Sequence, residues 1–195
     1  MFFDGEEAFV SWTAQDSLYV FINNQRNRRT HVFTLYYCAR YGARHLAERW
    51  EKEGKLENIE LFVLLDLMGG PNAAFYSLFD DTEHHVERLR AIEAQLRRAR
   101  GMAKKGSSST SASLFKQKGA MHHFRGIEDD HIPFLRRGVP IVHLISLPFP
   151  SVWHTASDTV ANVDRDVFTD LNKIMRVFVA EYFALPPPPK QPVEA

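Results

Sequence analysis

The chain has 195 residues, 45% of them apolar, and its 24 lysines and arginines balance 24 aspartates and glutamates. Such a composition is typical of one globular domain and excludes a disordered, collagen-like or coiled-coil chain. A net charge of zero gives no electrostatic reason to expect nucleic acid or an anionic membrane as a partner, and no apolar run reaches the roughly 18 to 20 residues of a membrane span. Cys38 is the single cysteine, which excludes an internal disulfide and a cysteine-rich zinc site.

Two apolar runs predict buried strands. The first is IELFVLL, residues 59–65, which is nearly continuous, as in a strand covered on both faces of a parallel sheet. It ends at Asp66. The second is VPIVHLI, residues 139–145, in which a proline fits only near the start of the strand.

Two segments predict helices. Apolar residues recur every three or four positions through a Glu/Arg-rich stretch, which predicts an amphipathic helix over about 83–103. The same spacing predicts a last helix over about 165–182, with Asp164 as its N-cap. Strands that alternate with helices indicate an α/β fold.

Two other stretches differ from the predicted core. Residues 20–41 hold four arginines and no acidic residue beside an aromatic, β-prone run, unlike the sequence on either side. Residues 186–195 begin with four prolines and predict an extended tail.

Carboxylates form the first candidate site residues. Glu6 and Glu7 are adjacent, and a turn in the backbone would point one toward a metal and the other toward a substrate proton, although adjacent glutamates are usually solvated. Asp66 lies just past a buried strand, where open α/β sheets bind ligands, but it is equally suited to a turn or a cap. Asp129 opens the acidic cluster Asp-Asp-His.

Trp153 and His154 follow the second predicted strand on a proline-rich loop, so they also belong at the carboxyl edge of the sheet. An aromatic ring beside an imidazole suits a small apolar pocket with a metal ligand, or else a packed tryptophan and a hydrogen-bonded histidine. His143 lies within the strand and is interpreted as a buried core histidine. Acidic groups and one histidine at one edge, with no cysteine available, indicate zinc bound by Asp, Glu and His.

Four motifs together resemble one known family. They are DGEEAF at 4–9, LLDL at 64–67 with GPN at 70–72, DDHIPFLRRGVP at 129–140, and PFPSVWHT at 148–155. In this order they closely resemble animal glutaminyl-peptide cyclotransferases over residues 1–19 and about 42–185. The resemblance implies the fold of zinc aminopeptidases, a mixed, largely parallel sheet flanked by helices. It also implies one zinc ion and the conversion of N-terminal glutamine or glutamate of peptides into pyroglutamate, with loss of ammonia or water.

The resemblance carries roles to matching positions. Glu7 and His154 resemble the family's zinc ligands, and Glu6 its acid/base. Asp66 and Asp129 resemble the hydrogen-bonded carboxylates that hold Glu6 and the substrate amine. His143 resembles a histidine behind the ligands. The family's pocket around the glutaminyl side chain is lined by residues that resemble Trp12, Ile127, Phe149 and Trp153.

The chain also departs from the family. A further aspartate ligand of the family lies well upstream of the Glu pair, so residues 1–185 are expected to correspond to the carboxyl-terminal portion of the catalytic domain. Residues 20–41 interrupt the family's sequence and have the borders of a retained intron, or of a lineage-specific surface loop. Two alternative functions stay open, a zinc aminopeptidase of the same fold and a catalytically silent peptide-binding module. Family members enter the secretory pathway, although this chain carries no visible signal.

Overall fold

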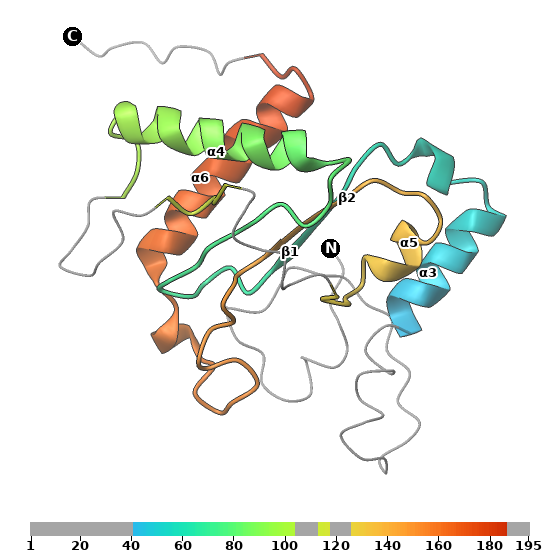
Figure 1. Cartoon of the computed structure of the whole chain (residues 1–195), viewed down its shortest axis with the longest axis horizontal. Coiled ribbons are helices and arrows are strands. Elements are labelled where there is room, and N and C mark those ends of the chain that lie inside the picture. The colour runs from blue at the N-terminus through green and yellow to red at the C-terminus, as the bar shows by residue number, and fades with distance from the viewer. Residues whose placement is uncertain (1–40, 104–112, 118–125, 187–195) are drawn as a thin grey trace, which may run out of the picture.

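The computed structural model describes residues 41–103, 113–117 and 126–186 (Figure 1). The predicted strands and helices lie within this part, whereas residues 1–40 and the tail from residue 187 lie outside it. In chain order the elements are α3 (Tyr41–Lys52), a 3-10 turn (Leu56–Asn58), β1 (Phe62–Asp66), α4 (Glu83–Arg98), α5 (Ile132–Leu135), β2 (Ile141–Ile145), a second 3-10 turn (Val160–Asn162) and α6 (Arg165–Tyr182).

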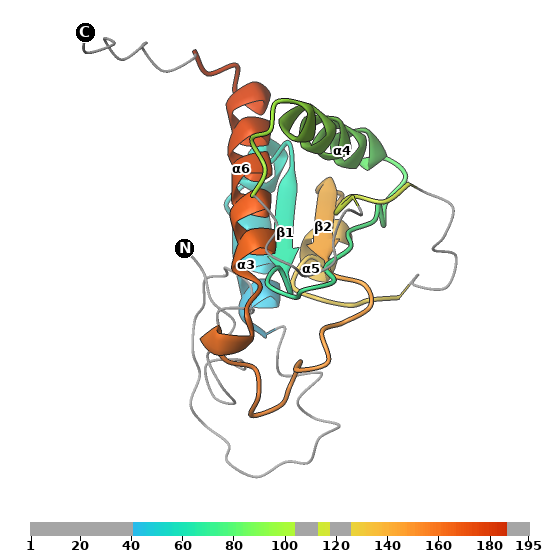
Figure 2. The same cartoon turned by 90° about the vertical axis from the view of Figure 1, so that its left-hand side faces the viewer.

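β1 and β2 pair in parallel, with Phe62 opposite Ile141 and Asp66 opposite Ile145 (Figure 2). Both strands begin later than the apolar runs suggest. Before β1, the Ile59 amide donates a hydrogen bond to the Leu56 carbonyl at 3.0 Å, so Ile59 still belongs to the end of the 3-10 turn. The expected proline position is confirmed, since Pro140 precedes β2 and its carbonyl accepts the Phe62 amide.

The two strands differ in burial. All five residues of β2 are buried, whereas in β1 only Leu64 is. β1 is nevertheless packed on both faces, as its apolar run predicts, since Val63 and Leu65 contact the larger core cluster and Phe62 contacts the cluster on the opposite face. Among the described residues β1 has one strand neighbour, β2, so its other edge is left without a strand.

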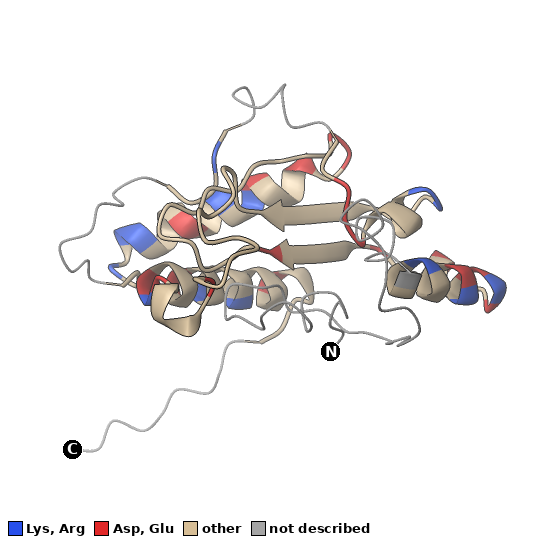
Figure 3. Ribbon diagram, turned by 90° about the horizontal axis from the view of Figure 1, so that it is seen from below, with Lys and Arg blue, Asp and Glu red and all other residues tan. Residues whose placement is uncertain are grey.

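Side chains alternate between the two faces of this sheet. Val142 and Leu144 join the larger core cluster, in which α4 contributes Val86, Leu89 and Ile92, and α6 contributes Val167, Leu171, Ile174 and Phe178. Ile141 and Phe62 point to the opposite face, where they pack with Ala47 of α3 and Phe134 of α5. Helices thus flank the parallel pair on both faces, which confirms the predicted α/β fold. Figure 3 shows that charged residues lie mainly on helices and loops, while the strands carry almost none.

The ends of α4 and α6 follow from local chemistry. Asp164 caps α6, because its side chain accepts hydrogen bonds from the amides of Asp166 and Val167, each at 3.0 Å, as predicted. α4 ends at Arg98, five residues before the predicted limit. Arg100 there has a φ of 56°, and the Gly101 amide donates back to the Leu96 carbonyl at 2.8 Å. This is the left-handed helix ending that satisfies the last free carbonyls.

No helix in the described part of the chain combines the length and the apolar character that a membrane crossing would require.

Candidate active site

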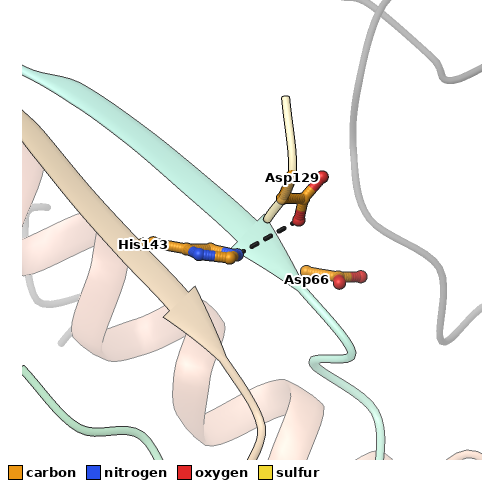
Figure 4. A group of neighbouring side chains, drawn as sticks. All are labelled: Asp66, Asp129 and His143. Carbon is orange, nitrogen blue, oxygen red and sulfur yellow. Dashed lines mark ion pairs between the residues drawn. The ribbon is translucent and has the colours of Figure 1, made fainter. Parts of the chain in front are cut away.

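The carboxyl edge of the sheet brings three chemically active side chains together (Figure 4). Asp66 is the last residue of β1, and His143 lies in the middle of β2, opposite Leu64. Because alternate residues of a strand face the same way, Asp66 and His143 share the face opposite the α4 and α6 core. Asp129, from the loop that leads into α5, approaches the same face.

The three residues lie within hydrogen-bonding and coordination range. Nε2 of His143 lies 3.1 Å from Oδ2 of Asp129. One ligand atom from each of Asp66, Asp129 and His143 lies within 4.8 Å of the others. His143 is 2% exposed, while the Asp129 side chain keeps 22% of its surface exposed. The pair therefore has one buried member and one that solvent or a ligand can reach.

Asp129 is held in its charged form. Burial by itself would raise the pKa of this carboxyl, but the hydrogen bond and the charge of His143 outweigh that effect. The backbone amide of Asp130, 2.7 Å from Oδ1, and the charge of His131 lower the pKa further. The resulting pKa lies below the ordinary value for aspartate, so at neutral pH the site presents a carboxylate that accepts protons only weakly.

His131 completes the buried part of the site. It is 1% exposed, its ring centroid lies 4.6 Å from that of His143, and the ring centroid of Phe79 lies 5.5 Å away in an edge-to-face arrangement. The His131 carbonyl also accepts the Leu135 amide at 2.8 Å, which starts α5. The helix thus holds His131 against His143, and through it fixes the ring that meets Asp129.

An apolar cluster adjoins this edge. Leu67, Ile145 and Leu147 are buried, and the residues packed against them are Tyr76, Leu78, Ile127, Phe149 and Trp153. The rings of Phe149 and Trp153 meet edge to face, with centroids 4.8 Å apart. His154 is exposed and stacks on Trp153 at 4.0 Å. Two residues here have left-handed backbone, Leu67 with a φ of 51° and His154 with a φ of 57°.

The structure places the sequence-predicted residues in two groups. It brings together Asp66, Asp129 and His143, and separately Ile127, Phe149 and Trp153. Glu6, Glu7 and Trp12 lie outside the described residues. Sequence reasoning noted His131 only as part of the Asp-Asp-His cluster, with no role, and missed Tyr76. His131 had a signal, since it directly follows the two aspartates, whereas Tyr76 had none.

The donor set of the first group fits a metal ion. Two carboxylates and an imidazole are oxygen and nitrogen ligands that zinc accepts. Within residues 41–103, 113–117 and 126–186, Asp66, Asp129 and His143 are the one group of three possible ligands. The interpretation of His143 as a buried core histidine therefore needs an addition, because its Nε2 also points into this group.

The sequence profile of peptidase family M28 matches residues 1–179. The chain belongs to peptidase family M28. It is also 42% identical over 186 residues to the glutaminyl-peptide cyclotransferase of Drosophila melanogaster, with 93% of this chain and 46% of that protein covered. The glutaminyl-peptide cyclotransferase of Bos taurus is 43% identical over 195 residues, with 95% of this chain and 46% of that protein covered.

A solved structure gives the same relationship. The crystal structure of Macrostomum lignano glutaminyl cyclase superposes with a TM-score of 0.68 at 32% identity, covering 83% of this M28 chain and 52% of that one. Against the acidobacterial glutaminyl cyclase the TM-score is 0.52 at 24% identity, a likeness of fold. The predicted aminopeptidase-like fold and the resemblance to glutaminyl cyclases are both confirmed. The chain spans about half the length of the relatives it matches.

Proposed function

We propose that this chain carries part of the active site of a glutaminyl-peptide cyclotransferase, which converts N-terminal glutamine or glutamate of peptides into pyroglutamate. The observation that carries the proposal is that the two groups share the end of β1: Asp66, its last residue, lies beside Asp129 and His143, and the next residue, Leu67, is buried in the cluster of Phe149 and Trp153. The name of the activity comes from relatives about 40% identical over nearly the whole chain.

The reaction requires orientation and proton transfer. The α-amine of the substrate attacks its own γ-carbonyl carbon, so the nucleophile is already at high effective concentration, and the site has to hold it close and deprotonated. We assign Glu6 to take the proton from the amine and return it to the leaving amide nitrogen. A carboxylate in this role contributes on the order of 10² to 10⁴ in rate.

The described residues hold the reacting groups. Asp129 stays ionised because its pKa is lowered, so it can accept a hydrogen bond from the substrate ammonium or amine. Asp66 lies beside it and is assigned to hold Glu6. Ile127, Phe149 and Trp153 offer apolar and aromatic surface to the methylene groups of the glutaminyl side chain and exclude water from it.

A zinc ion fits this proposal, with Glu7 and His154 as its assigned ligands. Bound there, zinc would act as a Lewis acid on the γ-carbonyl. The exposed imidazole of His154 is available to such an ion. Peptides with N-terminal glutamine or glutamate are then the partners, and we place the protein in the secretory pathway by its likeness to family members.

The test combines metal content with product analysis. Purified chain is assayed for zinc per polypeptide and for ammonia released from an N-terminal glutaminyl peptide, beside Glu6→Gln and the surface control Glu87→Gln. In protein extended upstream to the length of its relatives, we expect one zinc per chain and ammonia release that Glu6→Gln abolishes with the zinc retained, and no change in the control.

The alternatives give different products. A zinc aminopeptidase would release free amino acids instead of ammonia, and two metal ions per chain would accompany them. A silent peptide-binding module would bind the peptide with neither product. Ammonia release that survives Glu6→Gln would overturn the role assigned to Glu6.

A further inference from the structure

Glu93 is a buried carboxylate in the middle of α4. It is 1% exposed and lies on the apolar stripe of the helix, next to Ile92. A charge in this position is costly unless hydrogen bonds compensate it. Arg97, one turn later, donates to Oε1 of Glu93 from Nε at 3.0 Å and from Nη2 at 2.6 Å.

The remaining donors to Glu93 come from another part of the chain. The Leu114 amide donates to Oε1 at 2.8 Å, and the Phe115 amide donates to Oε2 at 3.1 Å. The hydroxyl of Ser113 donates to Oε2 at 2.6 Å. Both carboxylate oxygens therefore accept hydrogen bonds from consecutive residues of the segment 113–117, which lies about twenty positions after Glu93 in the chain. A helix needs no such contact for its own stability.

That segment is paired in turn with the loop that follows β1. The Phe75 amide donates to the Leu114 carbonyl at 2.8 Å, and the Lys116 amide donates to the Phe75 carbonyl at 2.9 Å. The rings of Phe75 and Phe115 pack at 5.6 Å, and both residues are almost fully buried. The position of Phe75 thus depends on the segment that Glu93 holds.

The loop after β1 then reaches the aromatic cluster of the site. The Leu147 amide, at the start of the loop that follows β2, donates to the Ala74 carbonyl at 2.9 Å. In the same pair of loops, a Cβ at Gly70 would lie 3.1 Å from Cγ of Pro150. The loop that carries Phe149 and Trp153 therefore rests on residues 70–75.

We propose that Glu93 is a positioning residue for the substrate pocket. It acts through the 113–117 segment and residues 74 and 75 on the loop of Phe149 and Trp153, without touching the substrate. The kinetic consequence of this role rests on the function proposed above. The chain of contacts that leads from Glu93 to the loop does not. An apolar side chain at this position would fill the stripe but leave the Leu114 and Phe115 amides unbound.

The decisive measurement is amide hydrogen exchange by mass spectrometry on the full chain, with wild type, Glu93→Gln and the exposed control Glu87→Gln. Glu93→Gln keeps the shape of the side chain but turns an acceptor into a donor that faces an amide or a hydroxyl. We expect faster exchange at 113–117, at 73–76 and at 145–154, with the β1 strand unchanged. The control should exchange like wild type throughout.

Two outcomes overturn the proposal. One is faster exchange that stops at 113–117 and leaves 145–154 as in wild type, and the other is no change anywhere. If Glu93→Gln does not fold, Ser113→Ala removes only a hydroxyl, which contacts the same carboxylate and the Phe115 carbonyl, and the same regions should respond in the same order with smaller changes. These readings need no turnover, so they stand whether or not the chain releases ammonia.

Kinetics separate positioning from general destabilisation. With a glutaminyl peptide as substrate, Glu93→Gln should raise KM by roughly 2- to 30-fold, the range expected for a residue that affects binding without touching the ligand, and leave kcat within about twofold. A fall in kcat with KM unchanged would contradict positioning of the pocket. Absence of ammonia release in wild type would instead count against the proposed function and leave the exchange result to decide the role of Glu93.

Discussion

Nε2 of His143 lies 3.1 Å from Oδ2 of Asp129, although the two residues come from different elements, and the imidazole is buried while the carboxylate is partly exposed. A buried imidazole that faces a carboxylate fixes both the orientation and the ionisation of its partner. The pair thus links the interior of the sheet to the surface where a substrate would bind.

The first prediction concerns acid stability. The pKa of Asp129 is lower in the folded chain than its ordinary value, because the hydrogen bond and charge of His143 outweigh burial. A carboxylate with a lowered folded pKa stabilises the fold above its unfolded pKa, about 3.9, and this contribution is lost as the pH falls through the folded pKa. The free energy of unfolding of wild type should therefore exceed that of Asp129→Asn at pH 7, and the difference should shrink below about pH 4.

Urea unfolding from pH 7 down to pH 3 measures that difference, with exposed Asp81→Asn as the control, expected within about 0.5 kcal/mol of wild type. A difference that stays constant over the whole range would mean that Asp129 contributes packing and no charge.

The second prediction concerns His85, at the start of α4. Its ring packs 6.0 Å from that of Phe178 and 5.8 Å from that of Tyr182 on α6, and burial, followed by the charge of His84, lowers its pKa. A histidine with a lowered folded pKa is protonated more readily in the unfolded chain. Stability should therefore fall as the pH drops below the unfolded value of about 6.5, until the folded pKa is passed.

His85→Leu removes the titrating group. As the pH is lowered from 7.5 to 5.5, the midpoint temperature of thermal unfolding should therefore fall further for wild type than for this variant. His45→Leu, at an exposed position of α3, serves as the control and should follow wild type. Parallel curves for wild type and His85→Leu would show that the helix contact tolerates the charge.

The third prediction concerns Gly70. A Cβ there would lie 3.1 Å from Cγ of Pro150, closer than an ordinary van der Waals contact, and a proline ring yields little. Gly70→Ala should destabilise the fold by roughly 1 to 3 kcal/mol and weaken binding of a glutaminyl peptide. Gly101→Ala meets the flexible end of Leu96 at 3.4 Å and should leave both quantities near wild type. Scanning calorimetry measures the stability and titration calorimetry measures the peptide binding. Equal stability and equal binding in the two variants would show that the loop of Pro150 moves freely.

The fourth prediction concerns the metal. If Glu7 and His154 bind zinc as proposed, His154→Ala should lose the ion, while Asp66→Asn should keep it and lose turnover. Zinc per chain after dialysis against a weak chelator distinguishes the two variants. Loss of zinc in Asp66→Asn with retention in His154→Ala would place the ion in the group of Asp66, Asp129 and His143 instead.

Much of the fold could be predicted because its signals are local. The N-cap at Asp164 and the stripes of α4 and α6 depend on residues within a turn or two of one another. Helix α3 was missed, although Ala43, Leu46, Ala47 and Trp50 have helical spacing, because the unusual composition before it obscured its start.

The site was predicted in part for a related reason. Asp66 and Trp153 follow predicted strands, and parallel strands bring their carboxyl ends to one edge. The contact of His131 with His143 depends on where α5 lies relative to β2, and no sequence pattern encodes that position. The burial of Glu93 has no signal in the Glu/Arg-rich sequence of α4, because its partners at 113–115 come from a segment whose place only the folded chain defines.

The left-handed backbone at Leu67 sets two demands against each other. A residue with a side chain costs about 1 to 2 kcal/mol in this conformation, and a glycine would avoid that cost. Leu67 nevertheless directly follows Asp66, and its buried side chain anchors the cluster beneath Phe149 and Trp153. Deleting a fully buried leucine side chain costs about 2 to 5 kcal/mol, which exceeds the conformational cost, so the packing of Leu67 decides the residue at this position. A library varied at residue 67 and sorted for thermal tolerance should therefore retain leucine or another large apolar residue and lose glycine, in spite of the left-handed backbone.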